Sequence, residues 1–283
     1  MTAKEAFKKI TDGIGHIYGD AESASIAAIV LEDGFGVKYN KLNEATVLDG
    51  GEEKEINKMV ERLLTHEPVQ YVLGKTIFYG LPFKVDANVL IPRQETEELV
   101  AWIIETVRRL PSTFCRILDI GTGSGCIPIV LKEKLPNAEV QALDVSKGAL
   151  RVANENAELN NQEIIFHEMD ILNESLWTHL PKYDIIVSNP PYITQDEKNI
   201  LAKNVIEFEP HLALFSGNND AQRFVKKIIG FAKNHLNKNG FLFFETNEFH
   251  AEQSKILLEE NGFTKVELRK DLNGNNRMLK GRG

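Results

Sequence analysis

Residues 119–125 read DIGTGSG and place three glycines directly after an apolar run. Glycines between a strand and a helix let the backbone turn sharply and let a ligand approach closely. The spacing is G-x-G-x-G rather than the G-x-G-x-x-G of dinucleotide sites, in which Cys126 would have to be glycine. The acid Asp119 is unfavourable near a pyrophosphate, whereas a cofactor with an amino acid and a sulfonium tolerates it. This segment favours S-adenosylmethionine over NAD and predicts cofactor contacts at Gly121, Thr122, Gly123, Ser124 and Gly125.

Further cofactor contacts are expected at the ends of the next two strands. Asp144 ends the strand after the glycine turn, about 20 residues on, where a carboxylate can accept hydrogen bonds from both ribose hydroxyls. Asp170 ends the third strand and could contact the adenine amino group, while Ile171 could pack on the base. Each feature alone is common in α/β proteins, so it is the combination that indicates a cofactor site.

The four residues 189–192, NPPY, carry groups that suit a planar nitrogen. Two successive prolines fix the backbone and donate no hydrogen bond, so their carbonyl oxygens stay free to face a ligand. Asn189 adds a side-chain oxygen acceptor, and Tyr192 adds an aromatic face. An amide, or an exocyclic amine on a base, is a poor nucleophile because its lone pair is delocalised. The segment therefore predicts a site that activates such a nitrogen.

The chemistry expected at this nitrogen is methyl transfer. Asn189 Oδ1 and the Pro190 carbonyl oxygen would accept its two hydrogens and direct its lone pair at the methyl group. Tyr192 would stack on the plane and stabilise the developing positive charge. Positioning and preorganised electrostatics then suffice without a general base before the attack. We predict catalytic roles for Asn189, Pro190 and Tyr192, and a substrate site formed by these three with Pro191.

The elements that must position these residues follow from the alternation of apolar runs and helical stretches after residue 95. Strands are predicted at 116–120, 138–144, 163–168, 183–188, 241–245, 265–269 and 277–280. Helices are predicted at 95–110, 124–134, 147–160, 221–236 and 248–261. This order predicts an α/β fold with a parallel sheet covered on both faces, whose strand ends form the ligand crevice. The last two strands lie too close for a crossover helix, so they should pair antiparallel.

The first part of the chain differs from the rest. Residues 1–73 show helical periodicity only, at 3–18, 23–32 and 52–64. In residues 74–92, aromatic and β-branched residues alternate around Gly80-Leu81-Pro82, which predicts a hairpin with its turn there. We therefore expect three parts: a helical domain (1–73), a hairpin linker (74–94) and an α/β domain (95–283).

Composition narrows the class of protein. The 283 residues carry a net charge of −8, which argues against a long nucleic acid as the main partner. Cys115 and Cys126 fit free thiols in a reducing cytoplasm, and no apolar run approaches the ~18–20 residues of a membrane span. The seven histidines show no metal-binding spacing, so no metal site is expected. We expect a cytoplasmic protein without membrane attachment or a stable nucleic-acid partner, and a monomer, since nothing requires a dimer.

Longer segments narrow the family. DIGTGSG resembles the first motif of class I S-adenosylmethionine methyltransferases, and NPPY resembles their amide- and amine-nitrogen branch. EPVQYVLG at 67–74 and VLIPRQETE at 89–97 resemble the domain junction and a signature of the HemK/PrmC family. EFEP at 207–210, followed by Ala213-Leu214, and DLNG at 271–274 with Arg277 also fit. The resemblance extends from about residue 67 to residue 283.

This resemblance implies a class I S-adenosylmethionine-dependent methyltransferase fold. A seven-stranded, mostly parallel, doubly wound sheet would follow a small all-helical domain and a β-hairpin. The implied activity is methyl transfer to the side-chain amide nitrogen of the glutamine in the Gly-Gly-Gln motif of class 1 peptide chain release factors, which act in translation termination. S-adenosyl-L-methionine would be the cofactor and S-adenosyl-L-homocysteine the product. The helical domain would bind the release factor away from its reactive loop.

The family pattern also maps onto site residues, with some departures. It implies that residues 121–125, Asp144, Ile171 and Asn189 line the cofactor, and that residues 189–192 hold the glutamine. Four residues depart from the pattern and bear on the shape of the pocket. They are Gln94 in place of proline, Ile171 where some members carry an aromatic residue, and Thr246-Asn247 in place of Ile-Gly.

Alternative functions remain open at this point. One is an amino-group methyltransferase acting on adenine or guanine in nucleic acid, because NPPY serves such enzymes too. The net charge, the VLIPRQETE segment and the lack of a basic, aromatic-interleaved region argue against it. Another is a non-enzymatic module that only senses S-adenosylmethionine, against which the complete NPPY argues. A NAD oxidoreductase does not fit the glycine spacing.

Overall fold

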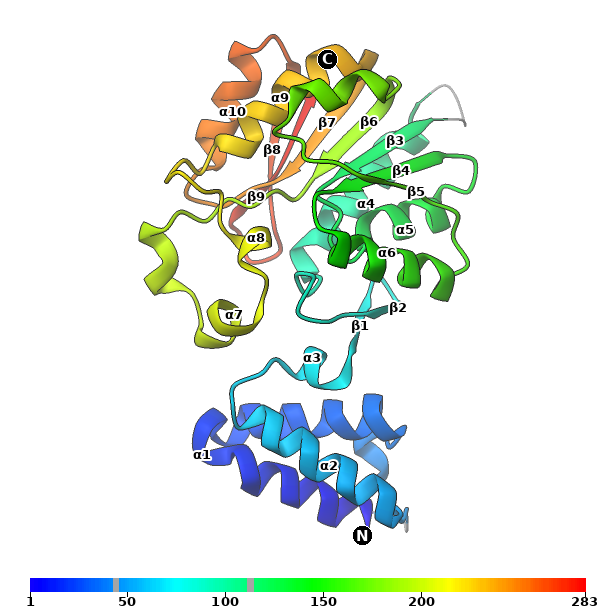
Figure 1. Cartoon of the computed structure of the whole chain (residues 1–283), viewed down its shortest axis with the longest axis vertical. Helices are drawn as coiled ribbons and strands as arrows, with labels where there is room; N and C mark the ends of the chain where they lie inside the picture. The colour runs from blue at the N-terminus through cyan, green and yellow to red at the C-terminus, as the bar shows by residue number, and fades with distance from the viewer. Residues whose placement is uncertain (43–45, 111–114) are drawn as a thin grey trace. The chain divides into compact units, whose positions relative to one another are not determined.

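The computed structural model describes residues 1–42, 46–110 and 115–283. The chain divides into two compact units. Residues 1–75 with 202–208 form the helical unit, and residues 76–201 with 209–283 form the sheet unit. Figure 1 follows the chain from the N-terminal helices in blue to the last strands in red. Among the described residues, no helix combines the length and apolar character needed to cross a membrane.

The helical unit contains α1 (Ala3–Ile29), a π-helical turn (Val30–Gly34), a short 3-10 turn (Tyr39–Lys41), α2 (Gly50–Leu63), α3 (Val69–Leu73) and α7 (Lys203–Phe208). The N-termini of α1 and α2 are fixed by capping boxes, in which Thr2 pairs with Glu5 and Asp49 with Glu52. The predicted break after residue 18 is a kink inside α1, where Gly19 has a positive φ of 73°. Buried aliphatic side chains from α1, the π-helical turn and α2 form the core of this unit.

The hairpin forms as predicted, but its turn was misplaced. Strands β1 (Lys75–Phe78) and β2 (Leu81–Lys84) make a two-stranded sheet around Tyr79 and Gly80. Both turn residues have positive φ, 52° and 78°, as a two-residue hairpin turn of type I′ requires. The predicted turn Gly80-Leu81-Pro82 is wrong because Leu81 and Pro82 lie in β2. The backbone N–H of Tyr79 donates to the carboxylate of Glu97, which supports the unusual conformation of Tyr79.

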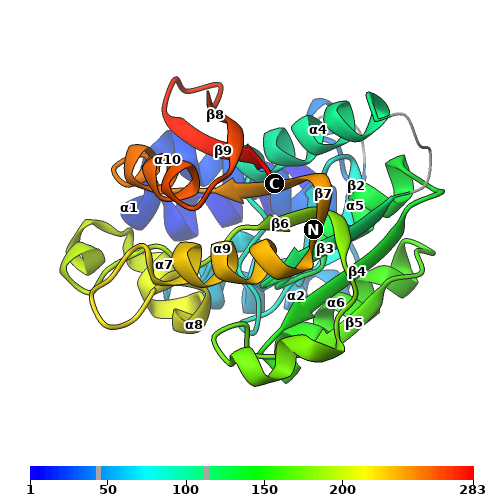
Figure 2. The same ribbon diagram turned by 90° about the horizontal axis from the view of Figure 1, so that it is seen from above.

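The main sheet has seven strands in the order β5-β4-β3-β6-β7-β9-β8. They are β3 (Arg116–Ile120), β4 (Glu139–Asp144), β5 (Ile165–Glu168), β6 (Tyr183–Ser188), β7 (Leu236–Glu245), β8 (Thr264–Lys270) and β9 (Asn276–Arg282). The first five run parallel, and β9 lies antiparallel between β7 and β8. Figure 2 shows this order from β8 and β9 across to β4 and β5. The predicted mostly parallel, seven-stranded sheet is confirmed.

Helices cover both faces of the sheet. Neighbouring residues of one strand, such as Ile117 and Leu118 of β3, belong to different core clusters, so both faces are buried. One cluster includes side chains of α4 (Gln94–Arg108), α5 (Cys126–Lys134) and α6 (Lys147–Leu159). The other includes side chains of α9 (Arg223–His235) and α10 (Ala251–Glu260). The two groups of helices can be followed in Figure 1.

Three short elements described in the sheet unit carry no sequence prediction. They are 3-10 helices at Glu174–His179 and Asp196–Ile200, and α8 at His211–Leu214. Within the connection from β6 to α9, Ile193 and Phe215 form an isolated β-bridge. These segments have four to six residues, too few to show a helical period.

Candidate cofactor and active site

A cavity of about 240 Å³ opens at the carboxyl ends of the central strands of the sheet unit. Ten of the twelve predicted site residues line it: Gly121, Thr122, Gly123, Ser124, Asp144, Asp170, Ile171, Asn189, Pro190 and Pro191. The sheet explains this meeting, because β3, β4, β5 and β6 are neighbours that run parallel and so end at one edge. Gly125 and Tyr192 lie outside the lining.

The glycine turn has the backbone conformation that its glycines allow. Gly121, Gly123 and Gly125 all have positive φ, of 76°, 56° and 79°. A Cβ on Gly125 would come within 3.1 Å of Ala153 and of Ile129, so this glycine allows close packing of the turn against α6. Gly121 and Gly123 have open space where a Cβ would stand, and both line the cavity.

Asp144 fastens the glycine turn to the end of β4. Its Oδ2 accepts a hydrogen bond from the backbone N–H of Gly123 at 2.9 Å, and its Oδ1 accepts one from Ser146 at 2.9 Å. Burial raises the pKa of Asp144, and these backbone hydrogen bonds oppose the shift. Each carboxylate oxygen retains a second lone pair, so the group can still accept from a ligand.

Asp119 is buried without a hydrogen bond of normal geometry to any described residue. Its side chain is fully inaccessible, and neither carboxylate oxygen has a hydrogen-bond partner within the described residues. Burial raises the pKa of Asp119 to about 7, the nearby hydroxyl of Thr122 opposes this shift, and the negative charge of Asp144 adds to it. The hydroxyl of Thr122, a residue that lines the cavity, is buried and unpaired as well. A ligand with a positively charged donor would satisfy such groups, which fits the amino-acid portion of S-adenosylmethionine.

The two residues predicted to contact adenine follow the shortest parallel strand. Asp170 lies two residues beyond the end of β5, and its Oδ1 accepts a hydrogen bond from the N–H of Leu172 at 2.9 Å. Ile171 is 6% exposed, and its carbonyl oxygen accepts from the indole N–H of Trp177. Both line the cavity, with Ile171 held in place by the core behind it.

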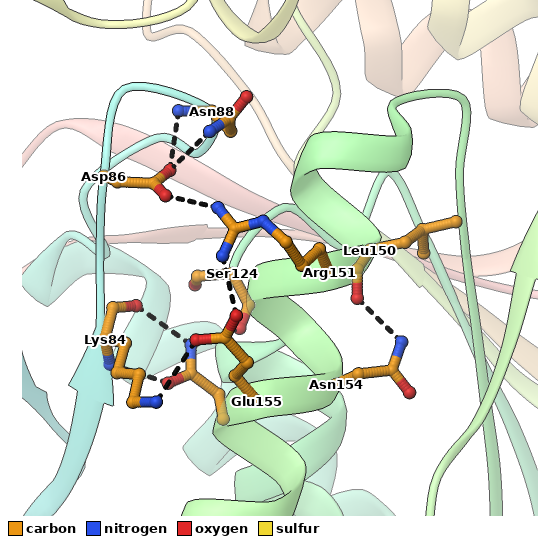
Figure 3. Close-up of polar contacts among 9 residues, drawn as sticks. Lys84, Asp86, Asn88, Ser124, Leu150, Arg151, Asn154 and Glu155 are labelled. Carbon is orange, nitrogen blue, oxygen red and sulfur yellow. Dashed lines mark hydrogen bonds and ion pairs between the residues drawn. The ribbon is translucent and has the colours of Figure 1, made fainter.

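Polar contacts connect a further part of the cavity wall to α6 (Figure 3). Asn156 is fully buried, and its Nδ2 donates to the carbonyl oxygens of Ser124 in the glycine turn and Lys84 in β2. Its Oδ1 accepts from the backbone N–H of Lys84 at 2.6 Å. Nearby, Arg151 pairs with Asp86, whose carboxylate also accepts from Asn88. Because Asn88 lines the cavity, these contacts position the segment after the hairpin.

Asn189 takes part in a hydrogen-bonded series of three side chains. Its Nδ2 donates to Thr96 Oγ1 at 3.4 Å, and Thr96 Oγ1 donates to Glu245 Oε2 at 2.6 Å. Burial raises the pKa of Glu245 to about 7, opposed by the hydrogen bond from Thr96, the charge of Arg277 and a direct interaction with the Asn189 side chain. Sequence analysis missed both partners. An acid at the end of an apolar strand was the available signal for Glu245, and the VLIPRQETE segment, which contains Thr96, was the signal for the second residue.

Tyr192 is half-buried beside the same group of charges. Burial raises its pKa, and the carboxylate of Glu245 adds to the shift while Arg277 and Arg93 oppose it. The phenol is therefore neutral near pH 7. Since Tyr192 does not line the cavity, its predicted stacking on a substrate stays a prediction.

An ion pair closes one rim of the cavity. Arg93, which precedes α4, pairs with Glu209, which precedes α8, and both flanking segments line the cavity. The Glu209 side chain is 1% exposed, and its second oxygen has no partner among the described residues. The pair therefore connects the 87–93 segment to the 209–213 segment. Sequence analysis noted both motifs without predicting their contact.

Comparisons with known proteins agree with this geometry. A family profile described as "Methyltransferase small domain" matches residues 103–213. The chain is 43% identical to the release factor glutamine methyltransferase of Flavobacterium psychrophilum over 99% of both chains. It is 36% identical to that of Bacteroides thetaiotaomicron over 95% of this chain and 96% of the other. A solved methyltransferase from Pyrococcus furiosus shares the fold, with a TM-score of 0.52 and 18% identity over 83% of this chain and 98% of that one. Family and fold imply use of S-adenosylmethionine.

Proposed function

This chain belongs to the release factor glutamine methyltransferase family, and we propose that it methylates the side-chain amide nitrogen of the glutamine in the Gly-Gly-Gln motif of class 1 peptide chain release factors. The observation that carries this proposal is that Asn189, Pro190 and Pro191 line the same cavity as the glycine turn. A methyl donor and a planar amide would therefore meet in one space. The activity would act on translation termination, in the cytoplasm.

Bound S-adenosylmethionine would supply an electrophilic methyl group on a positively charged sulfur. The glycine turn, Gly121, Thr122, Gly123, Ser124 and Gly125, would hold its amino-acid portion, and the buried carboxylate of Asp119, which lies outside the lining, would attract its positive charge. Asp144 would accept from the ribose hydroxyls. Asp170 and Ile171 would contact the adenine. Except for Asp119 and Gly125, the residues in these assignments line the cavity.

The substrate amide would be oriented by Asn189 and Pro190. Asn189 Oδ1 and the Pro190 carbonyl oxygen would accept the two N–H groups, which turns the nitrogen lone pair toward the methyl carbon. As the nitrogen–carbon bond forms, the carbon–sulfur bond breaks and its electron pair stays on sulfur. The nitrogen then loses one proton to solvent. Tyr192 would lie against the amide plane and Pro191 would fix the backbone, so the chain's contribution is orientation and charge stabilisation.

The helical N-terminal region would recognise the release factor outside its reactive loop. We take residues 1–73 as this recognition domain, 74–94 as the linker and 95–283 as the methyltransferase domain. Hydrogen exchange of the full chain, with and without a release factor, tests this assignment. Slower exchange in α1 and α2 is expected on binding, and unchanged exchange there would contradict the assignment.

The oligomeric state is a separate prediction. We expect a monomer, and light scattering of the same samples measures it.

The activity is tested by transfer of labelled methyl from S-adenosylmethionine to a purified release factor. The control is a release factor whose Gly-Gly-Gln glutamine is replaced by alanine. Label on the unmodified factor and none on the variant is the expected result. Label on RNA or DNA instead would favour an amino-group methyltransferase acting on adenine or guanine. Bound cofactor without transfer to any substrate would favour a sensor.

A further inference from the structure

The end of β6 and the end of β7 bring an asparagine and an acid side by side. Ser188 pairs with Phe244 in the register of these parallel strands. Asn189 and Glu245, the next residue of each segment, therefore lie next to each other at the same edge of the sheet. Thr96, in the first turn of α4, hydrogen-bonds to both side chains, and the Asn189 side chain also acts on Glu245 directly and lowers its pKa. Thr96 and Glu245 are each 3% exposed, so water does not compete for their hydrogen bonds.

The chemistry of the three side chains determines which of them donates and which accepts in each hydrogen bond of this series. An ionised carboxylate only accepts, so the single hydroxyl proton of Thr96 is directed to Glu245. The oxygen of Thr96 must then accept, and the only donor of Asn189 is its Nδ2. The other end of the amide, Oδ1, is left for the cavity that Asn189 lines.

We propose that Thr96 and Glu245 are positioning residues that fix the orientation of the Asn189 amide, so that an acceptor rather than a donor faces the substrate. This inference rests on the proposed function and assigns roles to two residues outside NPPY. A donor facing the substrate would oppose the N–H groups of a glutamine amide. Reversal of the series would thus impair turnover without removing any group that touches substrate or cofactor.

Protonation of Glu245 is one way to reverse the series. A protonated acid can donate to Thr96, whose hydroxyl can then donate to Asn189 Oδ1 and turn the amide over. Charged and titratable groups near Glu245 are Arg277 on β9, Glu95 on α4, Tyr192 after β6 and Cys126 on α5. Because the pKa of Glu245 is raised to about 7 by burial, turnover should fall as the pH falls through that value.

The test compares threonine variants on one helix. Thr96→Val removes the hydroxyl and keeps the shape of the side chain, whereas Thr96→Ser keeps the hydroxyl. Thr106→Val is the matched control on the same helix, because it removes another buried hydroxyl, which donates to the carbonyl oxygen of Trp102. The measurements are kcat and KM for release factor at saturating S-adenosylmethionine, with the melting temperature. We expect Thr96→Val to lower kcat about 10- to 100-fold, the scale for supporting residues, with unchanged cofactor affinity. Thr96→Ser and Thr106→Val should keep the kcat of the unmodified chain.

Glu245→Gln gives a second readout. Its amide can donate to Thr96 at any pH, so we expect low kcat and no loss of turnover specific to acid pH. Asp119, whose pKa is also about 7, titrates in both proteins, so the difference between the two pH profiles isolates Glu245.

Two outcomes would overturn the inference. One is an unchanged kcat in Thr96→Val, and the other is a pH profile of Glu245→Gln that matches the unmodified chain. Either result, with normal transfer by the unmodified chain, removes the positioning role alone. No transfer by the unmodified chain to any release factor removes the proposed function, and the inference with it.

Discussion

The two walls of the cavity are built in different ways. The cofactor wall, residues 120–124 with Asp144, is held by contacts between neighbouring strand ends: Gly121 N–H donates to the carbonyl of Leu143, and Gly123 N–H donates to Asp144. In the substrate wall, residues 189–191, Asn189 depends on Thr96, 93 residues away, and Thr96 on Glu245, 149 residues away. Contacts to the neighbouring strand end hold one wall, and side chains distant in sequence orient the other.

Among the variants proposed here, Asn189→Ala should reduce turnover the most. We expect turnover to fall by about 10²- to 10³-fold, the scale for loss of one preorganised polar group, while cofactor affinity changes little. Methyl transfer and cofactor titration measure the two quantities. Asn234→Ala, on α9, is the control, since that side chain bonds only to the carbonyl of Gly230 among described contacts. Full turnover in Asn189→Ala would remove its proposed role.

Asp119→Asn addresses the residue that precedes the cofactor wall. Loss of the unpaired carboxylate should raise the dissociation constant for S-adenosylmethionine about 10- to 100-fold, the scale of a charge-assisted hydrogen bond. Isothermal titration of the full chain measures it, with the exposed Asp12→Asn as control. Equal affinity in both variants would mean that Asp119 does not face the cofactor's charge.

The same residue predicts a pH effect on stability without cofactor. The folded pKa of Asp119 is raised from 3.8 to about 7, so the folded state binds the proton more tightly than the unfolded state. Its contribution to the free energy of unfolding therefore decreases as pH rises from about 4 to about 7. Denaturant unfolding across this range should show a smaller decrease in Asp119→Asn than in the unmodified chain. Parallel curves for the two proteins would contradict the assignment.

Gly123→Ala separates backbone strain from ligand contact. A residue with a side chain at φ 56° costs about 1–2 kcal/mol of backbone strain. Because Gly123 lines the cavity, the added methyl group would also take up space that a ligand could use. We expect a dissociation constant for the cofactor raised about 5- to 30-fold. Gly36→Ala is the matched control, because Gly36 has a φ of 70° and open surroundings in the helical unit. If both variants bind cofactor equally, the turn does not hold it.

The smallest effect is expected for Arg151→Ala. Half of the side chain is exposed, so the melting temperature should change by less than about 3 °C. Asn156→Ala, which removes the buried bonds to Ser124 and Lys84, should lower it by more. Calorimetry of both variants checks the order. A larger decrease of the melting temperature in Arg151→Ala than in Asn156→Ala would mean that the surface ion pairs in Figure 3 stabilise this part of the cavity wall more than the buried hydrogen bonds do.

The sequence predicted the family and the methyltransferase fold correctly, because both depend on local patterns. Apolar runs between helical periods fixed every strand of the sheet to within a few residues at most ends, and β7 alone begins five residues earlier than predicted. The position of β9 between β7 and β8 was not predicted, since strand order depends on long-range packing. Thr96, Glu245 and the Arg93–Glu209 pair were missed for the same reason. The roles of the site residues remain predictions.

The position of β9 also bears on how the chain folds as it is synthesised. Within the described residues, β8 has β9 as its only neighbour in the sheet, and β9 follows it in the chain. A growing chain that has extended through β8 therefore leaves that strand unpaired, and leaves the β7 edge open, until β9 emerges from the ribosome. An open edge favours pairing with other chains. The strand order thus makes the last step of sheet assembly the one most sensitive to a pause in synthesis.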